Sequence, residues 1–307
     1  MRGWVIALPL FLIIRREIME ATWQYTGQKP VKIKKFLQSL GMGHRLFNEI
    51  KKGQGQFLVD HRVVRPTTQI LPNQPLTIQV APEPADPTVA VSHEPLKLAY
   101  EDDNWLVVDK PAGVSSIPGP TTSNGTILNR VKGYLEEQGS EDLRPHLITR
   151  LDRFTSGLLL VAKHHVASSM ISQQVQQHQM LKEYTAVVSG RFADNHGVIN
   201  QPIARRGGQV ARVIAPDGQR AVTEYWVEDQ GVDWARLRLQ LHTGRTHQIR
   251  VHLASAGHPL IGDHLYGGDM TRADHQLLHA SKISFLDPFS QKQLTFTSSL
   301  PEEFNGF

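Results

Sequence analysis

Cysteine is absent from the sequence, and long apolar runs are scarce. Without cysteine there are no disulfides, no thiolate metal ligands and no cysteine nucleophile, which suits a reducing compartment such as the cytoplasm. The most apolar stretch, Trp4–Ile14, has only eleven residues, whereas a helix that crosses a bilayer needs about 20. We therefore expect neither a disulfide framework nor a membrane span.

The first nineteen residues differ in character from the rest of the chain. Their apolar stretch is flanked by arginines, and Arg15-Arg16-Glu17 stands where a secretory signal has small residues at its cleavage site. Ordinary globular sequence starts at Met19. We expect residues 1–19 to be an extension that does not belong to the folded protein, with Met19 as the true start. The alternative is an anchor on a membrane surface.

The remaining composition is typical of a globular protein with two domains. The chain has 307 residues, of which 40% are hydrophobic and 20% charged, and one domain usually takes about 100–200 residues. Residues 20–80 hold nine Lys or Arg and three Asp or Glu, a net charge of +6, whereas residues 81–307 carry −4. The basic segment 20–80, called the basic head below, precedes a mildly acidic remainder. This charge distribution predicts a module that binds a polyanion.

The basic head has the pattern of two short helices followed by two strands. Apolar residues recur with helical spacing over 30–40 and 44–52, and strand-like runs follow at 56–59 and 76–80. Basic side chains accompany the helices: Lys34, Lys35, Arg45, Lys51 and Lys52. We expect them to bind RNA phosphates with an affinity that falls with salt. The alternative is a charged helix pair that is merely solvated.

Residues 81–95 are rich in proline and are expected to form an extended linker to a second domain, residues 96–307. In that domain short β-rich runs outnumber helical ones. Strands are expected at 105–108, 157–162, 184–188, 221–227, 235–241 and 277–283, and helices at 127–137, 164–178 and 246–256. Strands and helices do not alternate regularly, which predicts an α+β domain built on a large sheet.

The most informative stretch is a charged turn that leads directly into an apolar strand, residues 149–163 (TRLDRFTSGLLLVAK). It places Asp152 between Arg150 and Arg153. The strand anchors the turn in the core, and the cationic neighbours favour the ionised form of the carboxyl group. Taken alone, the stretch is equally consistent with an aspartate that caps a turn for structural reasons.

A second stretch, HTGRTHQIRVHL at 242–253, is followed by GHPLIGD at 257–263 and LYG at 265–267. Together with the Asp152 stretch these motifs resemble the RNA pseudouridine synthases of the RluA/RluD type. Shorter matches are VVDKPAG (107–113), KEY (182–184) and LHA (278–280), and the resemblance covers residues 96–307. The basic head is similar to the S-four-type RNA-binding module, with His44-Arg45 and Asp60-His61 in place of that family's usual Ser-Arg and Asn-Gly.

The resemblance implies a fold and a set of site residues. The fold is a large mixed, mainly antiparallel β-sheet flanked by helices, preceded by a small α/β RNA-binding module. Asp152 is implied as the catalytic carboxylate, with Arg250 paired to it and Tyr184 against the target ring, where it assists deprotonation of C5. Arg150 is implied to fill the gap that the extruded uridine leaves in the RNA stack. Further RNA contacts are expected from Arg153, Arg245 and His247.

The chemistry of this family is consistent with these residue types. Isomerising uridine involves no redox change and no external donor, so no cofactor is expected. It needs an ionised carboxylate near C1′ of the ribose, which either attacks C1′ or removes the 2′ proton, and the sequence leaves both open. One departure is Thr149, where the family usually has histidine before Arg-Leu-Asp. We expect activity to survive there, while any RNA contact of that histidine is in doubt.

The residues that could indicate a metal site, a hydrolase or a glycosidase form less specific patterns. His275 and His279 have the spacing of a helical metal-ligand pair, but no glutamate lies between them and residues 277–283 have a strand pattern, so no metal is expected. Ser156 lacks the Gly-x-Ser-x-Gly context of many hydrolases. A glycosidase needs two carboxylates, and only one, Asp152, lies in the two longest matched stretches, 149–163 and 242–253.

The leading hypothesis is therefore an RNA pseudouridine synthase that acts on structured RNA. Large-subunit ribosomal RNA is the expected substrate, by resemblance to synthases that carry this basic module, with transfer RNA as the alternative. A catalytically silent RNA-binding factor in ribosome assembly is the rival from a different class. No protein partner is indicated, and a cytoplasmic monomer is expected.

Overall fold

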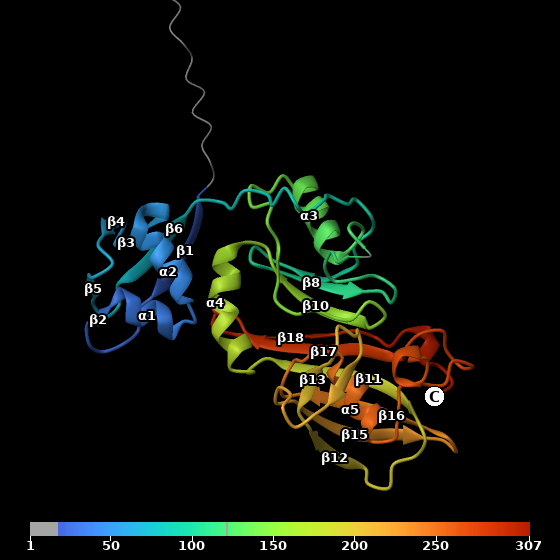
Figure 1. Cartoon of the computed structure of the whole chain (residues 1–307). Helices are drawn as coiled ribbons and strands as arrows, with labels where there is room; N and C mark the ends of the chain where they lie inside the picture. Colours follow the sequence, from blue (N-terminus) through green and yellow to red (C-terminus); the bar gives the residue numbers. More distant parts are fainter. Residues whose placement is uncertain (1–17, 121) are drawn as a thin grey trace, which may run out of the picture.

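The structure, a computed structural model, describes residues 18–120 and 122–307. It consists of a small N-terminal module, residues 19–80, and a large β-sheet with flanking helices (Figure 1). The predicted extension, residues 1–19, lies outside the described residues except at its end, where Met19 begins strand β1. Among the described residues we find no helix with the length and apolar character that crossing a membrane requires.

The N-terminal module is built on a four-stranded antiparallel sheet in the order β1-β6-β3-β4. Both predicted helices and both predicted strands are confirmed. The elements are β1 (Met19–Gln24), β2 (Val31–Lys32), α1 (Ile33–Ser39), α2 (His44–Glu49), β3 (Gly55–Val59), β4 (Arg62–Val64), β5 (Gln69–Ile70) and β6 (Pro75–Val80). A π-helical turn, Ile50–Gln54, follows α2.

Packing against the sheet explains why such short helices form. Neither helix has a side-chain cap, and isolated helices of this length are marginal in water. Apolar side chains of both helices are buried in one core with Phe57 and Ile78 of the sheet: Ile33, Phe36, Leu37, Leu46 and Phe47. The sequence does not predict β1, an edge strand in which only Ala21 and Trp23 are buried.

The large sheet is mixed and mainly antiparallel, as expected. Its strand order is β12-β15-β16-β11-β17-β10-β8-β7, with β18 paired to β17 and β9 to β10. The strands are β7 (Leu98–Glu101), β8 (Trp105–Lys110), β9 (His146–Leu147), β10 (Ser156–Ala162), β11 (Leu181–Ser189), β12 (His196–Asn200), β15 (Val222–Gln230), β16 (Trp234–Leu241), β17 (Leu278–Leu286) and β18 (Gln293–Thr297). A separate ribbon pairs β13 (Ile203–Arg205) with β14 (Arg212–Ile214).

Strand β10 lies inside this sheet, and all seven of its residues are buried. It runs parallel to β17, pairing Ser156 with His279 and Gly157 with Ala280. Gly157 is required here because its φ is +101° and because a Cβ atom would lie 2.4 Å from the carbonyl oxygen of Ala280. The glycine therefore lets the strand that follows Asp152 meet a strand from near the end of the chain.

Three helices accompany the sheet, at or near the predicted positions: α3 (Ile127–Glu137), α4 (His165–Gln176) and α5 (Gln248–Ser255). The proline-rich segment 81–95 contains no helix or strand, as expected of a linker. It nevertheless packs on α3, because Asn129 Nδ2 donates to the carbonyl of Ala90 at 2.7 Å and Lys132 Nζ to that of Val89 at 2.5 Å. The segment is thus attached to the folded body.

Helix α4 lies between the N-terminal module and the large sheet (Figure 1). Met170 of this helix belongs to the hydrophobic core of the module, and the amide of Gly43 donates to Ser169 Oγ at 3.0 Å. The indole of Trp23 adds a hydrogen bond to the carbonyl of Pro288 at 3.0 Å. These contacts hold the module against the rest of the protein.

A histidine caps the N-terminus of α4. His164 Nδ1 lies 3.2 Å from the amide of Ala167, whose N–H it accepts, and Nε2 lies 3.2 Å from Asn104 Oδ1, to which it donates. Acceptance at Nδ1 requires the neutral ring. Burial is the largest cause that lowers the pKa of His164 to about 4, so the cap is intact at neutral pH.

We predict that the free energy of unfolding decreases as the pH falls from about 6.5 to about 4. In this range the unfolded chain binds a proton at residue 164 and the folded chain does not, so acid favours unfolding by up to about 3 kcal/mol. Urea unfolding at several pH values measures the slope. His164→Asn keeps a capping acceptor and should reduce the slope, whereas His61→Asn, at an exposed turn, should not. Equal slopes for the wild type and His164→Asn would contradict this prediction.

Candidate active site

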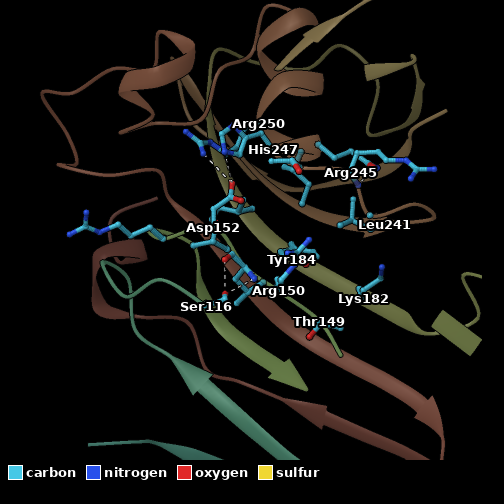
Figure 2. A pocket seen from close by; sticks show the side chains of 18 of the residues that line it. Ser116, Thr149, Arg150, Asp152, Lys182, Tyr184, Leu241, Arg245, His247 and Arg250 are labelled. Carbon is cyan, nitrogen blue, oxygen red and sulfur yellow. Dashed lines mark hydrogen bonds and ion pairs between the residues drawn. The ribbon is translucent and has the colours of Figure 1, made fainter. Parts of the chain in front are cut away.

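A cleft of about 590 Å³ brings together the two stretches that stand out in the sequence. Its walls come from the charged turn 149–153, from strand β11 and from the segment 244–250 that leads into α5 (Figure 2). Asp152 and Arg250 are hydrogen-bonded there although 98 positions separate them in the chain. The cleft is therefore assembled by the fold of the large sheet.

Ser116 and Lys110 fix the turn that carries Asp152. The Ser116 hydroxyl accepts from the amide of Leu151 at 3.0 Å and donates to its carbonyl at 2.7 Å. The buried ammonium of Lys110 donates, at 2.8–2.9 Å, to the carbonyl oxygens of Pro111, Val114 and Arg153. Burial lowers the pKa of Lys110 to about 7, against the opposing effect of the Asp152 charge. The backbone on both sides of Asp152 is thus tied to the loop 110–116.

Thr149, which departs from the family pattern, has a structural contact. Its Oγ1 accepts a hydrogen bond from the amide of Leu160 at 2.9 Å, and its own amide donates to the carbonyl of Leu160 at 3.3 Å. The side chain also lines the cleft. The threonine therefore joins the charged turn to strand β10.

Arg250 connects two carboxylates. Its Nη1 donates to Asp152 Oδ2 at 3.1 Å, while Nε and Nη2 donate to the two oxygens of Asp263 at 2.8 and 2.9 Å. Burial alone would lower the pKa of Arg250, but the hydrogen bonds and charges of Asp263 and Asp152 raise it. Among the described residues, no hydrogen bond reaches Oδ1 of Asp152. One oxygen of this carboxylate thus remains available to a ligand.

His247 and Tyr266 pack beside this ion pair. His247 Nδ1 and the Tyr266 hydroxyl are 3.0 Å apart, and His247 Nε2 lies 3.9 Å from Asp152 Oδ2. Burial is the main cause that lowers the pKa of His247, although the Asp152 charge opposes it. The ring of Tyr266 lies 5.1 Å from the guanidinium carbon of Arg250. These rings enclose the ion pair on the α5 side of the cleft.

Tyr184 comes from β11, at a point where the register between β11 and β17 shifts. The side chain is 9% exposed, and it lines the same cleft as Asp152 (Figure 2). Burial, with a contribution from the charge of Asp152, raises the pKa of Tyr184. Its phenol therefore stays protonated at neutral pH.

Cationic side chains line the rim of the cleft. Arg150 and Arg153 are exposed, and Arg245 is oriented by a 3.0 Å hydrogen bond from Nε to the carbonyl of Arg220. The pKa of the neighbouring His178 is lowered by partial burial and by the charges of nearby cations: Lys182, Arg245 and Arg220. A rim of this kind attracts a polyanion.

All seven residues that the sequence assigns to the site line this cleft: Arg150, Asp152, Arg153, Tyr184, Arg245, His247 and Arg250. The expected phosphate-binding residues of the module lie elsewhere and are exposed on α1, on α2 and on the turn that follows: Lys34, Lys35, Arg45, Lys51 and Lys52. Arg45 pairs with Glu49 at 2.8 Å. The protein thus has two separate basic regions.

Sequence reasoning gave no role to several residues that complete the site: Lys110, Ser116, Lys182, Asp263 and Tyr266. Four of them fall inside the short motifs at 107–113, 182–184, 257–263 and 265–267, and this position is the signal that points to them. Ser116 has no such signal. Its importance follows only from its two contacts with Leu151.

His275 and His279 contact different partners. His279 Nδ1 lies 2.9 Å from Ser156 Oγ inside the sheet, whereas His275 Nδ1 lies 2.5 Å from Asp274 on the surface. In the part of the chain that the structure describes, no group of three or more acidic or histidine side chains has the arrangement of a metal site.

Comparison with known proteins defines the class of this enzyme. Residues 104–255 match the family model described as RNA pseudouridylate synthase. A relative from Bacillus subtilis, the uncharacterized RNA pseudouridine synthase YjbO, is 38% identical over 272 residues, which cover 88% of this chain and 96% of the relative. The chain belongs to the RNA pseudouridine synthase family, and it is an isomerase.

Two further relatives give the family context. The ribosomal large subunit pseudouridine synthase D of Vibrio parahaemolyticus is 35% identical over 256 residues, 78% of each chain. The solved structure of the human RNA pseudouridylate synthase domain containing 1 has a TM-score of 0.57 at 24% identity, covering 71% of this chain and 86% of the human one. The structural likeness supports the fold described above.

We predict that Asp263→Asn lowers kcat by about a hundredfold with little change in KM, because Arg250 loses a charged partner and no longer holds Asp152 in place. Tritium release from RNA labelled at C5 of uridine measures the rate. Asp269→Asn, an exposed site whose carboxylate contacts Thr271, is the matched control. A rise in KM alone would show that Asp263 acts on RNA binding rather than on the position of Asp152.

Proposed function

We propose that this enzyme converts uridine to pseudouridine in large-subunit ribosomal RNA, with Asp152 as the catalytic carboxylate. The observation that carries the proposal is the arrangement of this side chain. One oxygen is held by Arg250 at 3.1 Å, and the other has no hydrogen bond from the described residues. Support for the substrate comes from relatives in three Vibrio species that are named ribosomal large subunit pseudouridine synthase D.

The reaction exchanges one bond to the ribose for another. The bond from N1 to C1′ breaks, the detached uracil reorients, and a bond from C5 to C1′ forms. C5 then loses its proton, and N1 ends with a proton. Asp152 begins the sequence in one of two ways. Its carboxylate forms an ester with C1′ that breaks when C5 bonds to C1′, or it removes the proton on C2′ to give a glycal and returns this proton when C5 bonds to C1′. Both routes need the ionised carboxylate, and neither changes the oxidation state overall.

Arg250 and Tyr184 have different tasks in this proposal. Arg250 holds Asp152 Oδ2 through a hydrogen bond at 3.1 Å and so directs the carboxylate. Tyr184 lies against the uracil ring and assists the loss of the C5 proton. Because its phenol is protonated at neutral pH, it acts as a relay that accepts this proton while its own O–H proton passes to water.

The rim of the cleft binds the RNA from which the target is extruded. Taking a base out of its stack costs a few kcal/mol, and a guanidinium plane replaces part of the lost stacking. Arg150, exposed at the cleft, is assigned this role. The remaining rim contacts to RNA are assigned to Arg153, Arg245 and His247.

The N-terminal module is proposed to act as an S-four-like RNA-binding domain, with residues 81–95 as its linker. Its exposed cations bind phosphates of a structured segment of the same RNA. Since α4 contacts the module through Met170 and the cleft through Val175, both basic regions can act on one RNA molecule. The described residues of one chain supply every side chain used here, which fits a monomer. The proposed ribosomal RNA substrate fits a cytoplasmic protein.

Mapping of pseudouridine with carbodiimide tests the substrate. Total RNA from cells with and without this gene is compared, and we predict the loss of at least one signal in large-subunit ribosomal RNA. Re-expression of the wild type should restore the signal, and re-expression of Asp152→Asn should not. If the missing signal lies in transfer RNA, the proposed substrate is wrong and the transfer RNA alternative holds.

We predict that Asp152→Asn abolishes tritium release while RNA affinity changes by no more than about twofold, because the amide keeps the shape but not the reactive charge. Filter binding measures the affinity. Asp274→Asn, at an exposed position, is the control and should retain full activity. Substantial turnover by Asp152→Asn would refute the catalytic role.

A further inference from the structure

A second cavity of about 440 Å³ adjoins the active-site cleft. Ile117 and Arg150 line both hollows, so the two are neighbours with a shared wall. The volume lies within the range of small-molecule sites, roughly 300–1,000 Å³. Nothing in the reaction at Asp152 uses this space.

Half of the residues that line the second cavity are apolar, and the others are polar or charged. Aliphatic side chains come from the proline-rich segment, from α3, from β9 and from the loops on either side of α3: Val89, Ile117, Leu128, Leu143 and Leu147. Val89 is held in place because Lys132 Nζ donates to its carbonyl and to that of Asp86. This lining suits a flat apolar group such as a nucleobase.

Charged groups complete the lining. Arg144 is half-exposed and forms ion pairs with Glu83 and Asp86 at 3.9 Å, a distance too long for hydrogen bonds. Its guanidinium therefore keeps donors for an anion. The Asp86 carboxylate, which also accepts from Thr88, provides an acceptor for a ligand that carries N–H groups.

We propose that this cavity binds a second extruded nucleotide, the immediate neighbour of the target uridine on the same RNA strand. Its base lies among the aliphatic side chains, and its phosphate lies at Arg144. The inference rests on the proposed function, because the target uridine has to occupy the cleft at Asp152. Arg150, which lines both hollows and is assigned to the gap in the RNA stack, then lies next to both extruded nucleotides.

Stacking energetics favour this neighbour over a distant base. When the target uridine leaves the helix, the adjacent base loses a stacking partner, so its own extrusion costs less. The Asp86 carboxylate accepts from an exocyclic amino group, which adenine, guanine and cytosine carry and uracil does not. The cavity should therefore prefer one of these three bases over uracil beside the target.

A fluorescent base tests the inference without turnover. The probe is an RNA nonamer of adenosines with one central uridine and 2-aminopurine on either its 5′ or its 3′ side, bound to the Asp152→Asn protein. Stacking with adenosines quenches 2-aminopurine, so entry into an aliphatic cavity should raise its fluorescence severalfold at one of the two positions.

Val89→Trp, made in the same Asp152→Asn protein, fills the cavity from a segment without helix or strand and should abolish the rise. Ala90→Trp is the matched control, because residue 90 is exposed and outside the cavity lining, and should retain it. In the otherwise wild-type enzyme, Val89→Trp should also lower kcat/KM for tritium release from ribosomal RNA severalfold. Thermal unfolding compares the stability of the two tryptophan variants.

Arg144→Gln is a second test of the inference, and unlike the tryptophan variants it does not enlarge a side chain. It should weaken binding of the same nonamer severalfold, whereas Arg191→Gln, at an exposed turn, should not. The absence of a fluorescence rise at both positions, or an equal rise with Val89→Trp, overturns the inference. Failure of the wild type to release tritium from ribosomal RNA would instead overturn the proposed substrate, since the fluorescence signal needs no reaction.

Discussion

The active site depends on a buried guanidinium shared between two carboxylates. Asp263 is 1% exposed and takes two of the N–H donors of Arg250, and Asp152 takes a third. A buried charge without a partner is costly, so Asp263 is what allows Arg250 to lie under the cleft. Asp152 is the more exposed of the two carboxylates, and it is the one that lines the cleft. The network thus fixes the direction of a carboxylate at the cleft.

The rest of the fold holds the backbone around this network. Asp152 follows an extended segment fixed by Ser116 and precedes the fully buried strand β10, while Lys110 binds three carbonyls of the surrounding turns. Thr149 also belongs to this frame. Its hydroxyl accepts a hydrogen bond from the backbone amide of Leu160 in β10, so this side chain helps to hold the turn against the strand.

Local patterns in the sequence predicted the elements well because periodicity and turn residues are local properties. The helix at 127–137 and the strands around 157–162 and 235–241 are examples. The site residues that lie within the charged motifs could also be predicted from the sequence. Asp263 and Ser116 were not given roles, because their importance lies in contacts across 13 and 35 positions with Arg250 and Leu151. Strand β1 escaped prediction because a short edge strand buries only two side chains, and no local pattern specifies the parallel β10–β17 pairing.

That pairing also sets the order in which the protein becomes functional during synthesis. Chains emerge from the ribosome N-terminus first, so β10 is made long before β17, its parallel partner from near the end of the chain. Contacts between such distant segments form late, because the chain must close a long loop first. A nascent chain that has made β10 but not β17 therefore holds the Asp152 turn without its neighbouring strand. The cleft, which Leu278 of β17 lines, is complete only after residues 278–286 have been made.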